Sequence, residues 1–370
     1  MGNYKFIVSG GGTGGHIFPA LSIADGLRKR FPTCEILFVG AEGKMEMDKV
    51  PAAGYRIVGL PVAGFHRGEI WRNLAFLPKL IRSMLEAKKV VKGFHPDVVI
   101  GVGGYASGPI LRVAASLHIP TVLQEQNSFA GVTNKILGRK ANKICVAYDK
   151  MERFFPAGKI VFTGNPIRKG LESITPGTAE AKEFFNISTD QPVILVVGGS
   201  LGARTLNQSM LASLELIRKS DVLIIWQTGK YYYEAIQKQL NENPVENIRL
   251  MEFIPRMDLA YSVADLVISR AGAGTISELC IVGAASILVP SPNVSEDHQT
   301  FNAMSLVEQD AAILVKDINA VRELIPDALA LVSNKEKCLK LSQNILRLAT
   351  PRATDDIVEV IATLLKKGND

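Results

Sequence analysis

Short apolar runs alternate with helical patterns along the first 165 residues. Seven of these runs have the length and composition of buried strands, at 4–9, 35–39, 56–60, 98–102, 121–124, 143–147 and 160–163. Strands separated by helices predict a parallel sheet with right-handed crossovers. The pattern restarts further along, with strands predicted at 192–197, 222–226, 248–253, 266–269, 286–289 and 312–315. The chain therefore predicts an α/β fold of two similar doubly wound parallel-sheet halves.

Each half opens with a strand, a glycine-rich turn and a helix. The first turn holds five glycines between Gly10 and Gly15, followed by His16, and Pro19 lies in the first turn of the predicted helix. The second turn spans 198–202. This arrangement directs backbone N–H groups and the positive end of a helix at an anion. The plain alternatives are a tight connection and a His16 that only caps the helix, although an imidazole there could also take a proton.

Further clusters follow predicted strands at 101–108, 125–127, 269–278 and 290–302. Ligands of parallel sheets bind at these strand ends. Thr275 and Glu278 have capping-box spacing, so Glu278 either caps a helix or holds ribose hydroxyls. His298 and Gln299 are either ligand contacts or parts of a polar loop.

The organisation of the chain follows from these patterns. We expect an N-terminal Rossmann-like domain at 1–163, a hinge and linker at 164–190 and a second Rossmann-like domain at 191–350. The tail at 351–370 carries a helical pattern over 355–365, which could pack back across either half.

The segment 70–92 is distinct. Its apolar residues form a helical stripe that predicts a core face, and Pro78 is expected to kink or restart the helix. Trp71 and Phe76 lie off this stripe among basic residues that include Arg72, Lys79 and Arg82. Such a mixture suits an anionic lipid surface, and the alternative is a solvated basic face.

Composition narrows the function classes only partly. Lys and Arg number 42 against 36 Asp and Glu, giving a net charge of +6, which suits several kinds of anionic partner. The four cysteines are scattered, as expected in a reducing compartment. Neither a signal peptide nor an apolar run of about 18 residues is present, so we expect a cytosolic or membrane-surface protein. The sequence also lacks a D-x-D pair and a P-loop motif, which argues against a metal-chelated diphosphate and a P-loop NTPase.

Six motifs in order resemble the MurG family of bacterial peptidoglycan glycosyltransferases: GGGTGGHIFP at 10–19, GVGGYASGP at 101–109, EQN at 125–127, GNPIR at 164–168, GGSLGAR at 198–204 and RAGAGTISE at 270–278. The resemblance runs essentially end to end. It implies a GT-B architecture with the active site between two Rossmann-like domains. It also implies inverting transfer of N-acetylglucosamine from UDP-GlcNAc to the C4 hydroxyl of lipid I, yielding lipid II.

The resemblance also assigns residues. Donor contacts would fall on Thr13, Gly14, Gly15, Asn127, Arg168, Ser200, Ile254, Thr275, Glu278 and Gln299. His16 would be the general base and Glu125 its candidate partner, while Gly103, Gly104, Tyr105 and Ser107 would face the acceptor diphosphate. Trp71, Arg72, Phe76, Lys79 and Arg82 would dock on the membrane. Two departures are Leu201, where many members have Gln, and Gln124, where many have His.

The implied partners are UDP-GlcNAc, lipid I, the cytoplasmic face of the bacterial inner membrane and other wall-synthesis proteins, with no nucleic acid. No cofactor is required on this view, although a divalent cation could stimulate the reaction. Three alternatives stay open: another GT-B UDP-sugar transferase, an NAD-dependent oxidoreductase built on the first glycine turn, and a non-catalytic nucleotide-sugar-binding scaffold. A nicotinamide-dependent oxidoreductase is expected to have a carboxylate directly after the second strand. That match is poor here, because Gly40 ends the strand and Glu42 lies beyond it.

Overall fold

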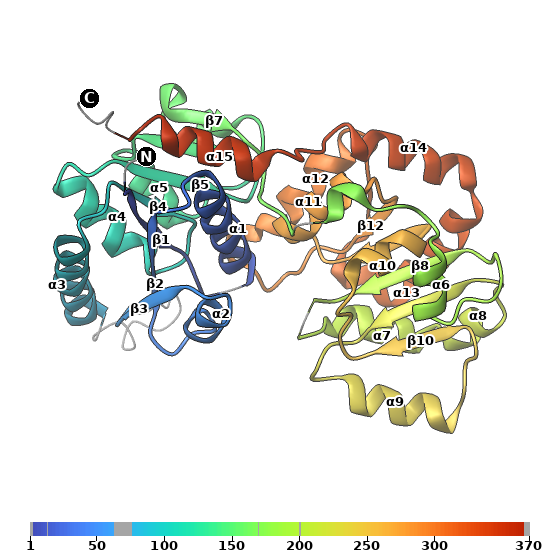
Figure 1. Ribbon diagram of the computed structural model, residues 1–370. Helices are drawn as coiled ribbons and strands as arrows, with labels where there is room; N and C mark the ends of the chain where they lie inside the picture. Colours follow the sequence, from blue (N-terminus) through green and yellow to red (C-terminus); the bar gives the residue numbers. More distant parts are fainter. Residues whose placement is uncertain (1–2, 13, 63–75, 169, 200, 366–370) are drawn as a thin grey trace. The chain divides into compact units, whose positions relative to one another are not determined.

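The computed structural model describes residues 3–12, 14–62, 76–168, 170–199 and 201–365. The chain forms two compact units, one of residues 1–168 with 352–370 and one of residues 169–351 (Figure 1). The segment 164–190, which the sequence suggested as a linker, is divided between them. Its first five residues belong to the first unit and the rest to the second.

The first unit is built on a seven-stranded parallel sheet of order β3-β2-β1-β4-β5-β6-β7. Its strands are β1 (Lys5–Ser9), β2 (Glu35–Ala41), β3 (Arg56–Leu60), β4 (Val98–Gly101), β5 (Thr121–Glu125), β6 (Lys143–Val146) and β7 (Ile160–Phe162). The interior strand β1 pairs with β2 on one side and β4 on the other. Its Phe6, Ile7 and Val8 are fully buried, because helices cover both faces of a parallel sheet.

The helices of this unit are α1 (Gly14–Arg30), α2 (Glu46–Ala52), α3 (Phe76–Phe94), α4 (Ser107–Ser116), α5 (Val132–Gly138) and the C-terminal α15 (Ala353–Ala362). Helix α15 lies against α1, as the red and blue helices of Figure 1 show. A Cβ on Gly26 of α1 would come within 2.8 Å of Thr354 and 2.9 Å of Val358. Ile357 and Ile361 are fully buried in the core that contains Phe6. Helix α15 thus completes the first unit.

The second unit repeats the design with a six-stranded parallel sheet of order β10-β9-β8-β11-β12-β13. Its strands are β8 (Val193–Val197), β9 (Leu223–Gln227), β10 (Ile248–Met251), β11 (Leu266–Ser269), β12 (Ser286–Leu288) and β13 (Ile313–Leu314). Its helices are α6 (Ala179–Phe184), α7 (Arg204–Ala212), α8 (Leu214–Arg218), α9 (Tyr233–Glu242), α10 (Met257–Val263), α11 (Ala273–Val282), α12 (His298–Val307), α13 (Asp317–Ser333) and α14 (Lys335–Leu346). The prediction of two doubly wound parallel sheets is confirmed.

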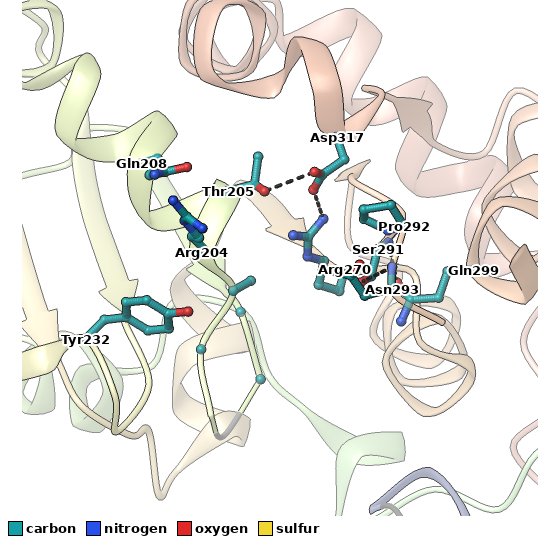
Figure 2. Close-up of a pocket in the computed structure, with 14 residues that line it drawn as sticks. Arg204, Thr205, Gln208, Tyr232, Arg270, Ser291, Pro292, Asn293, Gln299 and Asp317 are labelled. Carbon is teal, nitrogen blue, oxygen red and sulfur yellow. Dashed lines mark hydrogen bonds and ion pairs between the residues drawn. The ribbon is translucent and has the colours of Figure 1, made fainter. Parts of the chain in front are cut away.

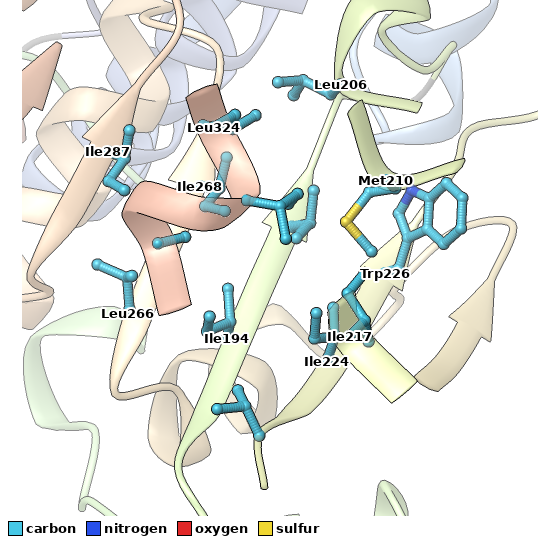
Figure 3. Close-up of a cluster of buried hydrophobic side chains, with 14 of the residues drawn as sticks. Ile194, Leu206, Met210, Ile217, Ile224, Trp226, Leu266, Ile268, Ile287 and Leu324 are labelled. Atoms are coloured by element: carbon cyan, nitrogen blue, oxygen red, sulfur yellow. The ribbon is translucent and has the colours of Figure 1, made fainter. Parts of the chain in front are cut away.

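A large core cluster of the second unit lies between the sheet and the helices of one face (Figure 3). Trp226 of β9 is fully buried there beside Met210 and Ile217. Its indole Nε1 donates to Asn207 Oδ1 at 3.0 Å, so the polar end of the ring is satisfied. Asn207 in turn donates to the carbonyl of Thr228, which fixes the first turns of α7 to the end of β9.

Helix α3 differs from the sequence-based expectation. The described helix begins at Phe76, so Pro78 lies in its first turn, where proline is tolerated, and residues 70–75 of the predicted stripe lie outside the described residues. The expected core stripe included Ile81 and Leu85 and is wrong at both positions, because their side chains are 55% and 58% exposed. The face that packs on the unit instead holds Ser83, Ala87 and Val91, one turn apart. None of the helices in the described ranges is long and apolar enough to span a membrane.

Candidate active site

The first glycine turn lies at the switch point of its sheet, between β1 and β4, where open α/β sheets bind ligands. Gly12 has φ +86°, a conformation that favours glycine, and α1 begins at Gly14. His16, in the first turn of α1, is half-buried, and its Nδ1 lies 3.2 Å from the Gly11 carbonyl oxygen. A carbonyl can only accept, so this contact requires a proton on Nδ1. Thr13, an expected donor contact, lies outside the described residues.

Glu46 is a buried carboxylate beneath this turn that the sequence reading missed. Its side chain has no solvent exposure and accepts from the Gly12 N–H and the Ala41 N–H, both at 2.9 Å. One N–H of the glycine turn is therefore already bound by an acidic group. A pyrophosphate cradle needs such N–H groups, so the contact argues against a dinucleotide site here. No local spacing signals Glu46, since its partners come from the ends of β1 and β2.

The turn after β4 packs onto the first glycine turn. Gly103 and Gly104 have φ of +95° and +85°, and a Cβ on Gly103 would lie 2.8 Å from His16 Nε2. Tyr105 is exposed. Ser107 is fully buried, and its hydroxyl lies 2.9 Å from the Ser9 carbonyl and 2.8 Å from the Gly103 carbonyl. That hydroxyl thus fastens the turn to β1, and any anion contact at Ser107 would use the backbone.

Glu125 ends β5 and organises the loop that follows. Its carboxylate is almost fully buried and accepts from the N–H groups of Asn127 and Gly131 and from the amide of Asn134. Burial raises the pKa of Glu125, and these hydrogen bonds oppose the rise. These hydrogen bonds fix the conformation of the loop that follows β5. The expected role as a proton-transfer partner has no support in these contacts.

The same loop is tied to the end of the first unit. Gln124 Nε2 donates to Asn165 Oδ1 at 2.8 Å, and Asn165 Nδ2 donates to the carbonyl of Gln126 at 3.0 Å. Asn127, an expected donor contact, is half-buried here, and Arg168 is exposed. Gln124, which departs from the family pattern, therefore has a structural use as an amide partner for Asn165.

The second unit carries a pocket of about 720 Å³ around the switch point between β8 and β11. Figure 2 shows Arg204 and Tyr232 on one side and Arg270, Ser291 and Gln299 on the other. The remaining lining residues are Gly198, Gly199, Gly202, Ala203, Thr205, Gln208, Pro292, Asn293 and Asp317. Two guanidinium groups and a glycine turn at a helix start suit an anionic ligand. Ser200 lies outside the described residues.

Arg270 is the centre of a hydrogen-bond network in this pocket. Its Nη1 lies 3.1 Å from the Val289 carbonyl and 3.2 Å from the Pro290 carbonyl, and it forms an ion pair with Asp317. The other Asp317 oxygen accepts from the Thr205 hydroxyl at 3.0 Å. The network joins the ends of β11 and β12 to the first turns of α7 and α13. Arg270 is the first residue of the motif at 270–278, but the sequence alone indicates no role for it.

Gln299 is held by the loop after β12. Its Oε1 accepts from the Ser291 N–H at 2.9 Å, which assigns the amide nitrogen as the group that can donate to a ligand. Of the expected donor contacts in this unit, Gln299 alone among the described residues lines the pocket; Ile254, Thr275 and Glu278 do not.

The capping box predicted for Thr275 and Glu278 is wrong. Helix α11 begins at Ala273 with Gly272 as its N-cap, so Thr275 already lies inside the first turn. Glu278 is 7% exposed and accepts from the Tyr261 hydroxyl at 3.1 Å. Its carboxylate is thus oriented by α10. Ile254, after β10, has a fully buried side chain, so a ligand contact there would use its backbone.

The membrane-docking residues are described only in part. Trp71 and Arg72 lie outside the described residues, as does the side chain of Phe76. Lys79 is exposed, and Arg82 bonds Glu86 at 2.9 Å on the exposed side of α3. Within the described ranges, no group of three His, Cys, Asp or Glu side chains is placed to hold a metal ion.

Comparison with known proteins gives consistent matches over nearly the whole chain. Residues 6–146 match the glycosyltransferase family 28 N-terminal domain and residues 193–357 its C-terminal domain. The UDP-N-acetylglucosamine--N-acetylmuramyl-(pentapeptide) pyrophosphoryl-undecaprenol N-acetylglucosamine transferase of Parabacteroides distasonis is 55% identical over 99% of this chain and 100% of its own length. The transferase of the same name from Porphyromonas gingivalis is 55% identical over 98% of this chain and 96% of its own.

A solved structure, MurG of Acinetobacter baumannii, superposes with a TM-score of 0.80 at 31% identity. It covers 98% of this chain and 100% of its own.

Proposed function

Because the chain belongs to glycosyltransferase family 28, we propose that it catalyses the reaction for which its curated relatives are named. It transfers N-acetylglucosamine from UDP-GlcNAc to N-acetylmuramyl-pentapeptide pyrophosphoryl-undecaprenol, the step that makes lipid II. The observation that carries this proposal is 55% identity over the full length of the Parabacteroides distasonis transferase. Both glycine turns and all six motifs fall within the matched span.

The chemistry is a single displacement at the anomeric carbon. The C4 hydroxyl oxygen of the acceptor sugar forms a bond to that carbon while the bond to the UDP oxygen breaks, so the configuration inverts. The hydroxyl proton passes to His16, and UDP leaves as the anion. A base with a pKa near the working pH accelerates such a step about 10²- to 10⁴-fold.

The two units contribute different groups. In the second unit, Glu278 holds the ribose hydroxyls, the backbone at Ile254 holds the uracil, and the Gln299 amide donates to the sugar. Charge on the departing diphosphate is met by backbone N–H groups at the starts of α7 and α11 and by arginine. In the first unit, the turn at Gly103 and Gly104 receives the acceptor diphosphate beside His16, consistent with the contact of that turn with the imidazole.

No bound metal is required on this proposal, because N–H groups and guanidinium groups supply the positive charge. Turnover in excess EDTA should equal turnover without it. Stimulation by Mg²⁺ above that basal rate would be compatible, whereas complete loss of activity in EDTA would contradict the proposal.

The protein docks on the membrane surface through α3, at the cytoplasmic face of the inner membrane. Leu80, Ile81 and Leu85 are exposed there among Lys79, Arg82 and three further lysines of the same helix. Exposed apolar side chains set among cations suit an anionic bilayer. Sedimentation with phosphatidylglycerol vesicles should exceed that with phosphatidylcholine vesicles and fall with salt; equal binding to both would contradict this electrostatic docking.

The test of the reaction is UDP release from UDP-GlcNAc with and without a short-chain lipid I analogue. Release that depends on the analogue supports the transferase. Binding of UDP-GlcNAc without release would favour the scaffold or another UDP-sugar transferase, and binding of NADH in its place would favour the oxidoreductase. His16→Ala should retain UDP-GlcNAc binding and lose turnover; near-normal turnover would remove His16 as the base.

A further inference from the structure

Glu46 occupies a space that the chain keeps open with glycines. A Cβ on Gly11 would lie 2.1 Å from Glu46 Oε1, and a Cβ on Gly40 would lie 2.6 Å from Glu46 Cγ. Gly11, unlike Gly12, does not have a left-handed backbone conformation. The glycine at position 11 is therefore needed for room, because any side chain there would displace the carboxylate. A carboxylate enclosed in this way, with both oxygens bound to backbone N–H groups, is built into the turn.

The peptide between Gly11 and Gly12 connects this carboxylate to His16. A trans peptide is planar, so its C=O and N–H point in opposite directions. The Gly12 N–H points at Glu46 Oε2, at 2.9 Å. The Gly11 carbonyl must then point away from Glu46, and it lies 3.2 Å from His16 Nδ1. Rotation of that peptide would break both contacts together.

We propose that Glu46 is a positioning residue that acts on His16 through the Gly11–Gly12 peptide. It fixes the carbonyl that accepts the Nδ1 proton, so the ring keeps the tautomer in which Nε2 is the basic atom. The Nε2 edge of the ring lies against Gly103, whose turn is assigned above to the acceptor. This inference rests on the proposed role of His16 as base, and it adds the group that orients that base.

Glu46 acts like the carboxylate that orients a catalytic histidine, except that a peptide unit lies between the two side chains. A direct partner fixes the tautomer and ring orientation of a catalytic imidazole. Here the negative charge polarises the peptide, which strengthens the carbonyl as an acceptor. For metal-bound histidines, loss of the group that hydrogen-bonds to the other ring nitrogen lowers metal affinity or activity about 10- to 100-fold. We expect loss of Glu46 to lower activity by a similar factor.

The first test measures the tautomer of His16 in the wild type and uses a variant only to assign its signal. Selective ¹⁵N labelling of the five histidines and long-range ¹H–¹⁵N correlation spectra report the tautomer of each neutral ring. His16, identified by the signal that is missing in His16→Gln, should carry its proton on Nδ1. A His16 with its proton on Nε2 would overturn the proposal, whether or not the protein transfers N-acetylglucosamine.

The second test compares Glu46→Gln with Asp48→Asn, a matched change at an exposed carboxylate of the same helix. Glutamine offers one acceptor oxygen and one NH₂ to two N–H donors, so one N–H is left facing a donor. With a lipid I analogue, Glu46→Gln should lower kcat about 10- to 100-fold and leave KM for UDP-GlcNAc within about threefold. It should also populate the Nε2–H tautomer of His16. Asp48→Asn should match the wild type in all three measurements.

The outcomes separate this inference from the proposed function. A wild type that lacks transferase activity but has Nδ1–H on His16 would refute the function and support the orientation by Glu46. A wild type that is active, with Glu46→Gln equally active and an unchanged His16 tautomer, would refute the inference alone. A Glu46→Gln protein that raises KM and leaves kcat and the tautomer unchanged would make Glu46 a purely structural residue, which also overturns it.

Discussion

Replacing Arg270 by methionine removes the centre of the network at the pocket of the second unit. The guanidinium and the Asp317 carboxylate are largely enclosed, with side chains 16% and 21% exposed. The substitution keeps the apolar stem and deletes the charged group. It leaves the Asp317 carboxylate without its cation and the Val289 and Pro290 carbonyls without this donor. The loop after β12, which carries Ser291 and holds Gln299, loses this side-chain link to Arg270 and keeps only backbone contacts such as that from the Val289 N–H to the Ser269 carbonyl.

The expected loss of stability follows from these contacts. Hydrogen bonds to a charged group contribute about 1.5–3 kcal/mol, and leaving one member of a buried ion pair costs about 3–5 kcal/mol. Water reaches this pair through the pocket, so we expect the lower range, about 2–3 kcal/mol. For a unit of this size, that corresponds to a fall in Tm of about 4–12 °C. Affinity for UDP should fall with it, because the network shapes the pocket.

The assay is urea unfolding followed by tryptophan fluorescence, since Trp226 lies in the core of this unit, together with calorimetric titration of UDP. The matched control is Lys340→Met, which removes an ion pair to Asp310 whose side chains are 65% and 73% exposed. Exposed pairs contribute about 0–1 kcal/mol, so the control should unfold almost like the wild type. If Arg270→Met unfolds at the same urea concentration as Lys340→Met, the network does not hold the pocket.

Three further predictions concern other sites. Tyr261→Phe removes the hydroxyl that orients Glu278, so calorimetry should give UDP affinity about 3- to 10-fold weaker with the fold intact, and an unchanged Kd would contradict the ribose assignment. Gly26→Val should lower the free energy of unfolding by about 1–3 kcal/mol, because the new side chain would clash with Thr354 and Val358. The control Gly93→Ala, which has open space around it, should not destabilise the protein. Equal Tm values for the two variants would contradict the packing of α15 on α1. Burial raises the pKa of Cys145 and of Cys280 to about 12, so at pH 8 about one thiol in 10⁴ is ionised. Iodoacetamide should therefore label the half-buried Cys34 and Cys338 first, and mass mapping that finds all four labelled at one rate would refute this.

The strands and their parallel order could be predicted because each carries its own signal. The run at 6–8 is buried on both faces of the sheet, and such continuous apolar stretches are typical of central parallel strands. The glycine turns were equally visible, since Gly12 and Gly103 are required by local backbone conformation. The site at each strand end then follows from topology, without knowledge of any side-chain contact.

The errors have a common physical cause, which is that partners distant in sequence decide what a residue does. Thr275 and Glu278 have the spacing of a capping box, but Tyr261 of another helix takes the glutamate. Ile81 and Leu85 have the spacing of a core stripe, yet the sheet side of α3 selects the smaller residues Ser83 and Ala87. Glu46 has no local signal in the sequence, because its importance depends on two N–H groups that lie at or after the ends of β1 and β2.

The two glycine turns, so similar in sequence, are chemically different in the folded protein. Beneath the first, Glu46 binds a backbone N–H and places negative charge where an anion would otherwise bind. The second opens into a pocket with Arg204 and Arg270, and the acidic residue among its described lining residues, Asp317, is already paired. A carboxylate that fixes the peptide behind a histidine orients that ring for proton transfer, and cations around a helix start favour binding of a diphosphate. On the proposed function, the same strand–turn–helix unit serves acceptor activation in the first unit and donor binding in the second. The difference arises from Glu46 and Arg270, which lie outside both turn motifs, and from Arg204 at the edge of the second.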